Sequence, residues 1–116
     1  MAKAKKAIIG LTEKVKVIGK KGKSKTLMAR IDTGATISSI DAKLAANLHL
    51  GPVVRTKLVK SAHGNKTRPV IPVKLKMAGK EIKSEFTIAD RKHMKYAVLI
   101  GQNILKKGFL IDPSIR

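Results

Sequence analysis

The residues whose types and spacing could carry out chemistry are Asp32, Thr33 and Gly34, which follow the apolar Ile31 directly. A glycine permits a tight turn in which the backbone lies close to the aspartate carboxylate. The threonine hydroxyl can hydrogen-bond across to a partner loop. Two carboxylates that share one proton can act as acid and base in one reaction. The chain offers one such motif, so a carboxylate pair would require two copies of the chain.

A second element lies close to the C-terminal end. Residues 96–105 begin with an apolar stretch, continue through Gly101 and end in an amphipathic helical turn. Each element also has a purely structural interpretation, because Asp and Gly are ordinary turn residues and a buried strand with a glycine turn is common. The interpretation of Asp32 as only a turn or capping residue therefore stays open.

Taken together, in this order and at this separation, the two elements resemble the retropepsin-like aspartic proteases. In that superfamily the catalytic loop comes early, and an apolar-apolar-glycine segment passes behind it before a short C-terminal helix. The resemblance extends from about Lys14 to Pro113 and is closest to the cellular family labelled RimK-associated or "ATP-dependent zinc protease". The matching segments are residues 29–35, 68–71, 89–91 with Met94 and Tyr96, 99–101 and 109–114.

The resemblance implies a mainly β fold: a retropepsin-like closed β-barrel with one or two short helices, active as a homodimer. It implies that Asp32 is the catalytic residue and that Thr33, Gly34 and Ala35 complete the active-site loop. The residues expected to support this loop from behind are Ile100, Gly101 and Gln102. The residues expected in the flap over the substrate, at a hairpin tip, are Ala62, His63 and Gly64.

The sequence departs from the patterns of these relatives just after the motif. The cellular family often carries Arg-Thr-Ser after the alanine, whereas residues 36–39 here read Thr-Ile-Ser-Ser. Many viral retropepsins pair an Asp after the motif with an Arg after the later glycine. The corresponding residues here are Thr36 and Gln102, both neutral, so a hydrogen bond could replace the ion pair without leaving a buried charge unpaired. Ala35 cannot donate a hydrogen bond to an ionised dyad, which favours a mildly acidic optimum.

Length and composition are those of one small globular domain. The chain has 116 residues, 43% hydrophobic residues, 3% aromatic residues and no cysteine. We expect a flexible basic tail at residues 1–12 and a protease domain at residues 13–116. The lack of cysteine excludes disulfides and thiol catalysis and fits a reducing compartment. No apolar stretch approaches the ~20 residues of a membrane span, so we expect a cytoplasmic protein without a membrane partner.

The net charge of +19, from 26 basic and 7 acidic residues, is extreme for this length. It predicts attraction to an acidic peptide, a ribosome or nucleic acid. Most of the basic residues are lysines spread along the chain, whereas sequence-specific reading of bases favours arginines and aromatic rings. The three histidines, His49, His63 and His93, lie in separate segments, and no phosphate-binding loop is present. We therefore expect neither a metal nor another cofactor.

Short alternating segments dominate the rest of the chain and favour a closed β architecture. The expected strands are residues 13–19, 26–31, 53–59, 67–73, 74–77, 81–88, 96–100 and 109–111. Two short helices are expected at residues 42–48, capped by Ser39 or Asp41, and at residues 102–107.

Three functions follow as hypotheses. The leading one is an aspartic endopeptidase that hydrolyses peptide bonds through an Asp dyad across a homodimer, with acidic or glutamylated peptides as candidate substrates. The second is a catalytically silent retropepsin-like module for dimerisation or peptide binding. The third is a basic ribosome- or RNA-associated protein in which the motif is incidental. Replacing Asp32 by Asn abolishes activity in the first case, spares binding in the second and has no effect in the third.

Overall fold

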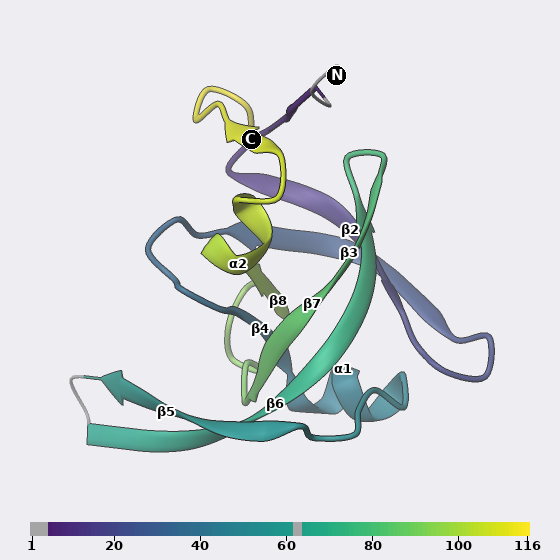
Figure 1. Cartoon of the computed structure of the whole chain (residues 1–116), viewed down its shortest axis with the longest axis vertical. Coiled ribbons are helices and arrows are strands. Elements are labelled where there is room, and N and C mark those ends of the chain that lie inside the picture. The colour runs from purple at the N-terminus through teal and green to yellow at the C-terminus, as the bar shows by residue number, and fades with distance from the viewer. Residues whose placement is uncertain (1–4, 62–63) are drawn as a thin grey trace, which may run out of the picture.

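The structure, a computed structural model, describes residues 5–61 and 64–116. In these residues the strands form a twisted barrel with short helices at its sides (Figure 1). The elements are β1 (Ala7–Ile9), β2 (Thr12–Ile18), β3 (Ser24–Ile31), β4 (Ser38–Asp41), α1 (Ala42–Asn47), β5 (Arg55–Ser61), β6 (Gly64–Met77), β7 (Lys80–Ala89), β8 (Val98–Ile100), α2 (Gln102–Leu105) and β9 (Phe109–Ile111). No helix in the described part of the chain is long and apolar enough to cross a membrane.

The barrel closes because β2 pairs with two strands. Its hydrogen-bonded order is β2-β3-β8-β4-β7-β6, and an antiparallel pairing of β6 with β2 joins the ends. Strand β5 adds to the outer edge of β6 and extends the sheet as a long hairpin arm (Figure 1). The expectation of a mainly β closed barrel with short helices is confirmed.

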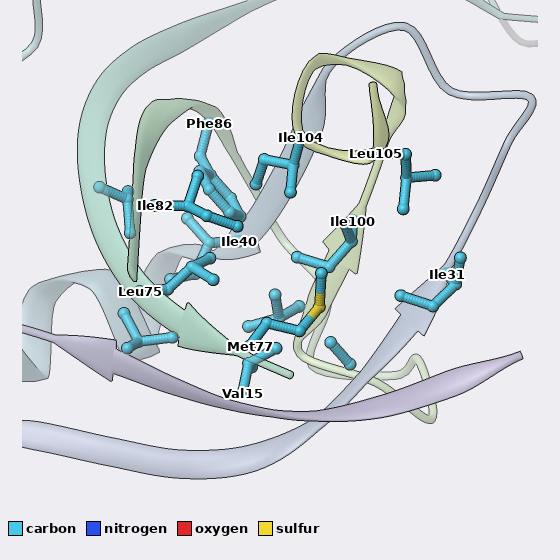
Figure 2. Packing of buried hydrophobic residues seen from close by; sticks show 14 of the residues in the cluster. Val15, Ile31, Ile40, Leu75, Met77, Ile82, Phe86, Ile100, Ile104 and Leu105 are labelled. Carbon is cyan, nitrogen blue, oxygen red and sulfur yellow. The ribbon is translucent and has the colours of Figure 1, made fainter. Parts of the chain in front are cut away.

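The core follows from the alternation of side chains along the strands. In β2, Val15 and Val17 are fully buried, whereas the lysines beside them are exposed. The helix α2 closes one side of the barrel, and Ile104 points into the same interior as Phe86 and Met77 (Figure 2). With few aromatic residues, the core is built mainly from Ile, Val and Leu.

The first described strand lies inside the stretch expected to be a flexible tail. Residues 7–9 form β1, which pairs in parallel with β9 in the register Ile8↔Leu110, and Ile9 is fully buried. Burial of Ile9 in the core stabilises this segment. The basic residues around it hide this contribution in the sequence. Residues 1–4, the beginning of the expected tail, lie outside the described residues.

A second difference from the sequence-based expectation is β4. The sequence predicts only a helix cap near Asp41, and the structure confirms that cap: its carboxylate accepts hydrogen bonds from the Lys43 and Leu44 backbone N–H groups. However, residues 38–41 also form a fully buried strand, parallel to β7 and antiparallel to β8. This central strand carries the chain from the Asp32 loop back into the barrel.

Candidate active site

The position of Asp32 is fixed by a parallel pairing in the centre of the barrel. Strand β3 ends beside β8 in the register Ile31↔Ile100. The backbone N–H of Asp32 continues this pairing and donates to the Ile100 carbonyl oxygen at 2.9 Å. The aspartate therefore directly follows Ile31, the buried last residue of β3, and begins a loop whose next two residues are exposed.

Within the loop, the backbone is folded tightly around the carboxylate. The Gly34 N–H donates to Asp32 Oδ1 at 2.9 Å, and the Ala35 N–H donates to the Asp32 carbonyl oxygen at 3.3 Å. A Cβ atom at Gly34 would lie 3.3 Å from Asp32 Oδ1, closer than most real Cβ contacts. A glycine at this position thus lets the backbone approach and orient the carboxylate. Thr33 is exposed beside it.

Gly101 and Gln102 lie directly behind this loop. A Cβ atom at Gly101 would lie 2.8 Å from the Ala35 carbonyl oxygen, so no side chain fits without displacing the loop. The Gln102 backbone N–H donates to the same oxygen at 2.8 Å, and its side-chain Nε2 donates to the Thr33 carbonyl oxygen at 2.7 Å. The loop is therefore held against the start of α2 through its own backbone.

The hydrogen bond by which Gln102 replaces an ion pair differs from the sequence-based expectation. Its amide reaches the Thr33 carbonyl, not the Thr36 side chain. The Thr36 hydroxyl instead accepts from Lys57 Nζ of β5 at 3.5 Å. Because the Gln102 amide is neutral, its hydrogen bond to the Thr33 carbonyl leaves no charge that an acidic residue in place of Thr36 would have to balance.

A buried polar network, which the sequence analysis missed, connects the loop to the rest of the barrel. Asn103 Oδ1 accepts from both the backbone N–H and the hydroxyl of Ser38, at 2.9 and 2.8 Å. Its Nδ2 donates to the Ser84 hydroxyl and the Glu85 carbonyl of β7. The Ser38 hydroxyl in turn accepts from the Gly101 N–H at 2.9 Å. One signal was available: buried serines need partners, and Asn103 follows the loop-supporting Gln102.

A cleft of about 400 Å³ opens beside the loop. Residues 34–37 of the loop form one wall, and residues 57–60 of β5 form the opposite wall. Asp32 itself does not line the cleft, but it lies two residues before Gly34, where this wall begins. The hairpin formed by β5 and β6 thus lies across from the motif, and its residue Gly64 begins β6. Ala62 and His63, the other expected flap residues, lie outside the described residues.

The cleft is strongly basic. Its charged lining residues are Lys57, Lys60, Arg68 and Arg91, and none of the lining residues in the described chain is acidic. Burial lowers the pKa of the Arg91 guanidinium below its ordinary value, and the charge of Arg68 lowers it further, while Asp41 opposes the shift. Arg91 is held in place because its Nε donates to the Tyr96 carbonyl oxygen at 3.0 Å and its backbone N–H to Asp41 Oδ1 at 2.8 Å.

Solved structures with a similar fold indicate the class to which this fold belongs. A protein of unknown function from Legionella pneumophila matches over 94% of this chain and 95% of its own, with a TM-score of 0.65 and 23% identity. The EIAV protease, solved with an inhibitor, matches over 83% of this chain and 85% of its own, with a TM-score of 0.64 and 24% identity. The simian foamy virus protease matches over 82% and 91%, with a TM-score of 0.59 and 22% identity. The fold is that of the retropepsins.

The family follows from the sequence. The family model described as "RimB-like: Retropepsin-like aspartic endopeptidase RimB" matches residues 43–116, more than half of the chain. The chain belongs to this RimB-like family of retropepsin-like aspartic endopeptidases. The matched range begins after the Asp32 loop, so it includes Gly101 and Asn103 but not the motif itself.

A curated relative contains a similar stretch within a much longer protein. A probable alpha-L-glutamate ligase from Desulfotalea psychrophila is 32% identical over 66 residues, which are 56% of this chain. The match covers 14% of the length of that relative, so the chain corresponds to a small part of it.

Proposed function

We propose that the protein is an aspartic endopeptidase whose catalytic dyad forms from Asp32 of each protomer across a homodimer. A two-fold axis would bring the two identical carboxylates together, and like charges at that separation hold one proton between them. The unprotonated carboxylate accepts a proton from a bound water, which attacks the peptide carbonyl. The protonated carboxylate donates to the substrate, and the peptide bond is cleaved.

The observation that carries this proposal is the way the loop presents Asp32. The carboxylate accepts from the Gly34 N–H at 2.9 Å, and the loop behind it is fixed by Gln102. This group lies next to a cleft of about 400 Å³, with the β5–β6 hairpin on the other side. A turn aspartate would make the same hydrogen bond to the backbone two residues on, but it would need neither the support of the loop by Gln102 nor an adjoining cleft.

The experiment that tests the proposal compares wild-type protein with Asp32→Asn on a mixed peptide library across pH 4–7. We expect cleavage by the wild type and at least a ~10³-fold loss in the variant, because the amide cannot accept the proton from water. The matched control is Asp112→Asn, the same change at a carboxylate of the C-terminal turn that does not line the cleft. It should leave cleavage unchanged.

The opposite outcome is equally informative. If dimeric wild-type protein cleaves nothing, or if Asp32→Asn cleaves as well as the wild type, the endopeptidase proposal is wrong. Retained dimerisation and peptide binding without turnover would favour the silent binding module. Dimerisation is measured in parallel by sedimentation, so a failure to assemble is separated from a failure of chemistry.

For the substrate, we propose a peptide with acidic side chains. Two arginines and two lysines line the cleft, and no acidic residue of the described chain lines it, although Asp41 lies close enough to act on Arg91. Arg91 is fixed at its edge. Carboxylates form short, strong hydrogen bonds with arginine and lysine, so acidic side chains are the partners that such a site binds best. The stretch similar to this chain within a probable alpha-L-glutamate ligase supports glutamate-containing peptides as substrates, because that protein is named for adding glutamate.

The substrate proposal is tested with two peptides that differ only in Glu or Gln residues beside the cleaved bond. Arg91→Gln should lower kcat/KM for the Glu peptide about tenfold, the cost of one hydrogen bond to a charged group. It should change the Gln peptide by less than about twofold. Arg91→Lys should restore part of the loss, whereas Lys43→Gln, outside the cleft, should change neither. Equal cleavage of both peptides by the wild type would overturn the acidic substrate but not the endopeptidase.

A further inference from the structure

A second basic surface lies on the outer face of the barrel, away from the cleft. It is formed where β2, the end of β6 and the start of β7 run side by side (Figure 1). The strand alternation that buries Val15, Val17 and Leu75 turns the residues between them outward. The outward lysines, here called the lysine face, are Lys14, Lys16, Lys74, Lys76 and Lys83.

The strand register forces these lysines together. Lys16 lies directly opposite Lys76 across the β2–β6 pair, and Lys74 lies directly opposite Lys83 across the β6–β7 pair. Like charges placed directly opposite on neighbouring strands destabilise a sheet. The lysine face therefore lowers the stability of the barrel unless an external anion neutralises it.

Little within the described chain offsets this charge. Glu81 is opposite Lys76, and its carboxylate lies 3.9 Å from Lys74 Nζ, with both side chains half exposed. It is the one carboxylate at the outward positions of these three strand segments in the part of the chain that the structure describes. Such an exposed pair is weak, so five lysines face solvent with one acid among them.

A groove next to the lysine face gives it depth. It has a volume of about 300 Å³, and Lys20, Lys74 and Lys83 contribute three ammonium groups to its lining. None of the residues that line this groove also lines the cleft beside Asp32. The Lys107 ammonium donates to the Lys83 carbonyl oxygen at 3.1 Å and adds a further cation at the edge of the surface.

We propose that the lysine face and its groove bind the phosphate backbone of a nucleic acid. A sheet face with lysines in fixed register matches a polymer whose negative charges are regularly spaced. Ammonium groups bind phosphates as point charges without a required orientation. The outward positions carry no aromatic ring for stacking, so contacts to the backbone, which position a protein without reading bases, are the expected mode. This inference does not depend on the proposed function, because the two sites share no residue.

The test uses fluorescence anisotropy with a labelled uridine oligonucleotide of about 20 nucleotides, titrated over about 50–200 mM salt. The variant Lys16→Gln/Lys74→Gln/Lys76→Gln removes three charges from the lysine face. The matched control, Lys43→Gln/Lys92→Gln/Lys95→Gln, removes three exposed charges elsewhere. We expect the first variant to lose at least about tenfold in affinity and to reduce the salt slope by about 2, because each single-strand phosphate contact contributes about 0.7. The control should change much less.

A second variant separates loss of binding from loss of folding. Lys16→Glu places a carboxylate opposite Lys76 on β6, and the residue opposite it on β3 is the neutral Thr26, so it should raise Tm while it weakens RNA binding. Three results would overturn the proposal. The two triple variants could lose RNA affinity equally, or the wild type could fail to bind RNA at about 50 mM salt. In the third, the lysine-face variant would keep its RNA affinity and lose only its binding to anionic lipid vesicles, measured in parallel. Peptide cleavage by the lysine-face variant should equal that of the wild type.

Discussion

The two walls of the cleft beside Asp32 are built in opposite ways. The Asp32 loop is bound to the barrel from behind, by two hydrogen bonds from Gln102 and by the close approach of Gly101. The facing strand β5 lies at the edge of the sheet, next to β6 alone in the strand order, and exposes Leu58 to 53%. Local stability follows burial and hydrogen bonding. The fold therefore places rigidity behind the Asp32 carboxylate and leaves the facing arm easier to displace.

The sharpest way to break this contrast is Gly101→Ala. The new methyl group would lie 2.8 Å from the Ala35 carbonyl oxygen, so the loop or α2 must shift. We expect a loss of about 3 kcal/mol in the free energy of unfolding, at the upper end for overpacking, together with loss of cleavage. Chemical denaturation and peptide hydrolysis measure the two effects.

Gly34→Ala is the comparison variant for Gly101→Ala. Its methyl group would contact Asp32 Oδ1 at 3.3 Å but would meet no buried backbone. It should lower kcat with a much smaller effect on stability. If Gly101→Ala left both stability and activity unchanged, the claim that the loop is held from behind would be wrong.

Asn103→Ala should have the next largest effect. It removes the acceptor for Ser38, which is fully buried, and the donor to the Glu85 carbonyl. Leaving such groups without partners should cost about 2 kcal/mol and should lower kcat by displacing the loop. Ser84→Ala, which removes one hydroxyl acceptor for the same amide, should cost about 1 kcal/mol or less. Equal effects would contradict the central position of Asn103.

Leu58→Ala on the opposite wall should have the smallest effect on stability. The side chain is 53% exposed on an edge strand, so the free energy of unfolding should change by less than about 0.5 kcal/mol. Because Leu58 also lines the cleft, KM for a peptide should rise while kcat changes little. A loss of stability as large as that of Asn103→Ala would show that β5 is as firmly built into the barrel as the loop.

The sequence was sufficient for the elements with strong local signals. The sequence predicted β2, β3 and the turn between β6 and β7, and Asp41 marked the start of α1. The two strands expected at residues 67–73 and 74–77 form the single strand β6. The sequence was insufficient for β4, because residues 38–41 consist mainly of polar residues typical of turns. Their burial depends on partners distant in the chain, such as Asn103 and Thr87.

The same limit applies to the site. The motif at Asp32 and its supporting residues could be named from the sequence, and these roles stay predictions. The basic cleft could not, because Lys57, Arg68 and Arg91 come from three separate segments that only the barrel brings together. The pairing of β1 with β9 was equally hidden, since three residues in each strand carry no periodic signal.

The central claim, a dyad shared between two protomers, is tested most directly by mixing wild-type protein with Asp32→Asn at constant total concentration. Once subunits have exchanged, a mixed dimer has one functional carboxylate and should be inactive. Cleavage should then fall with the square of the wild-type fraction, to about one quarter in an equal mixture. A linear decline, to about one half, would mean that each protomer acts alone and would contradict the account.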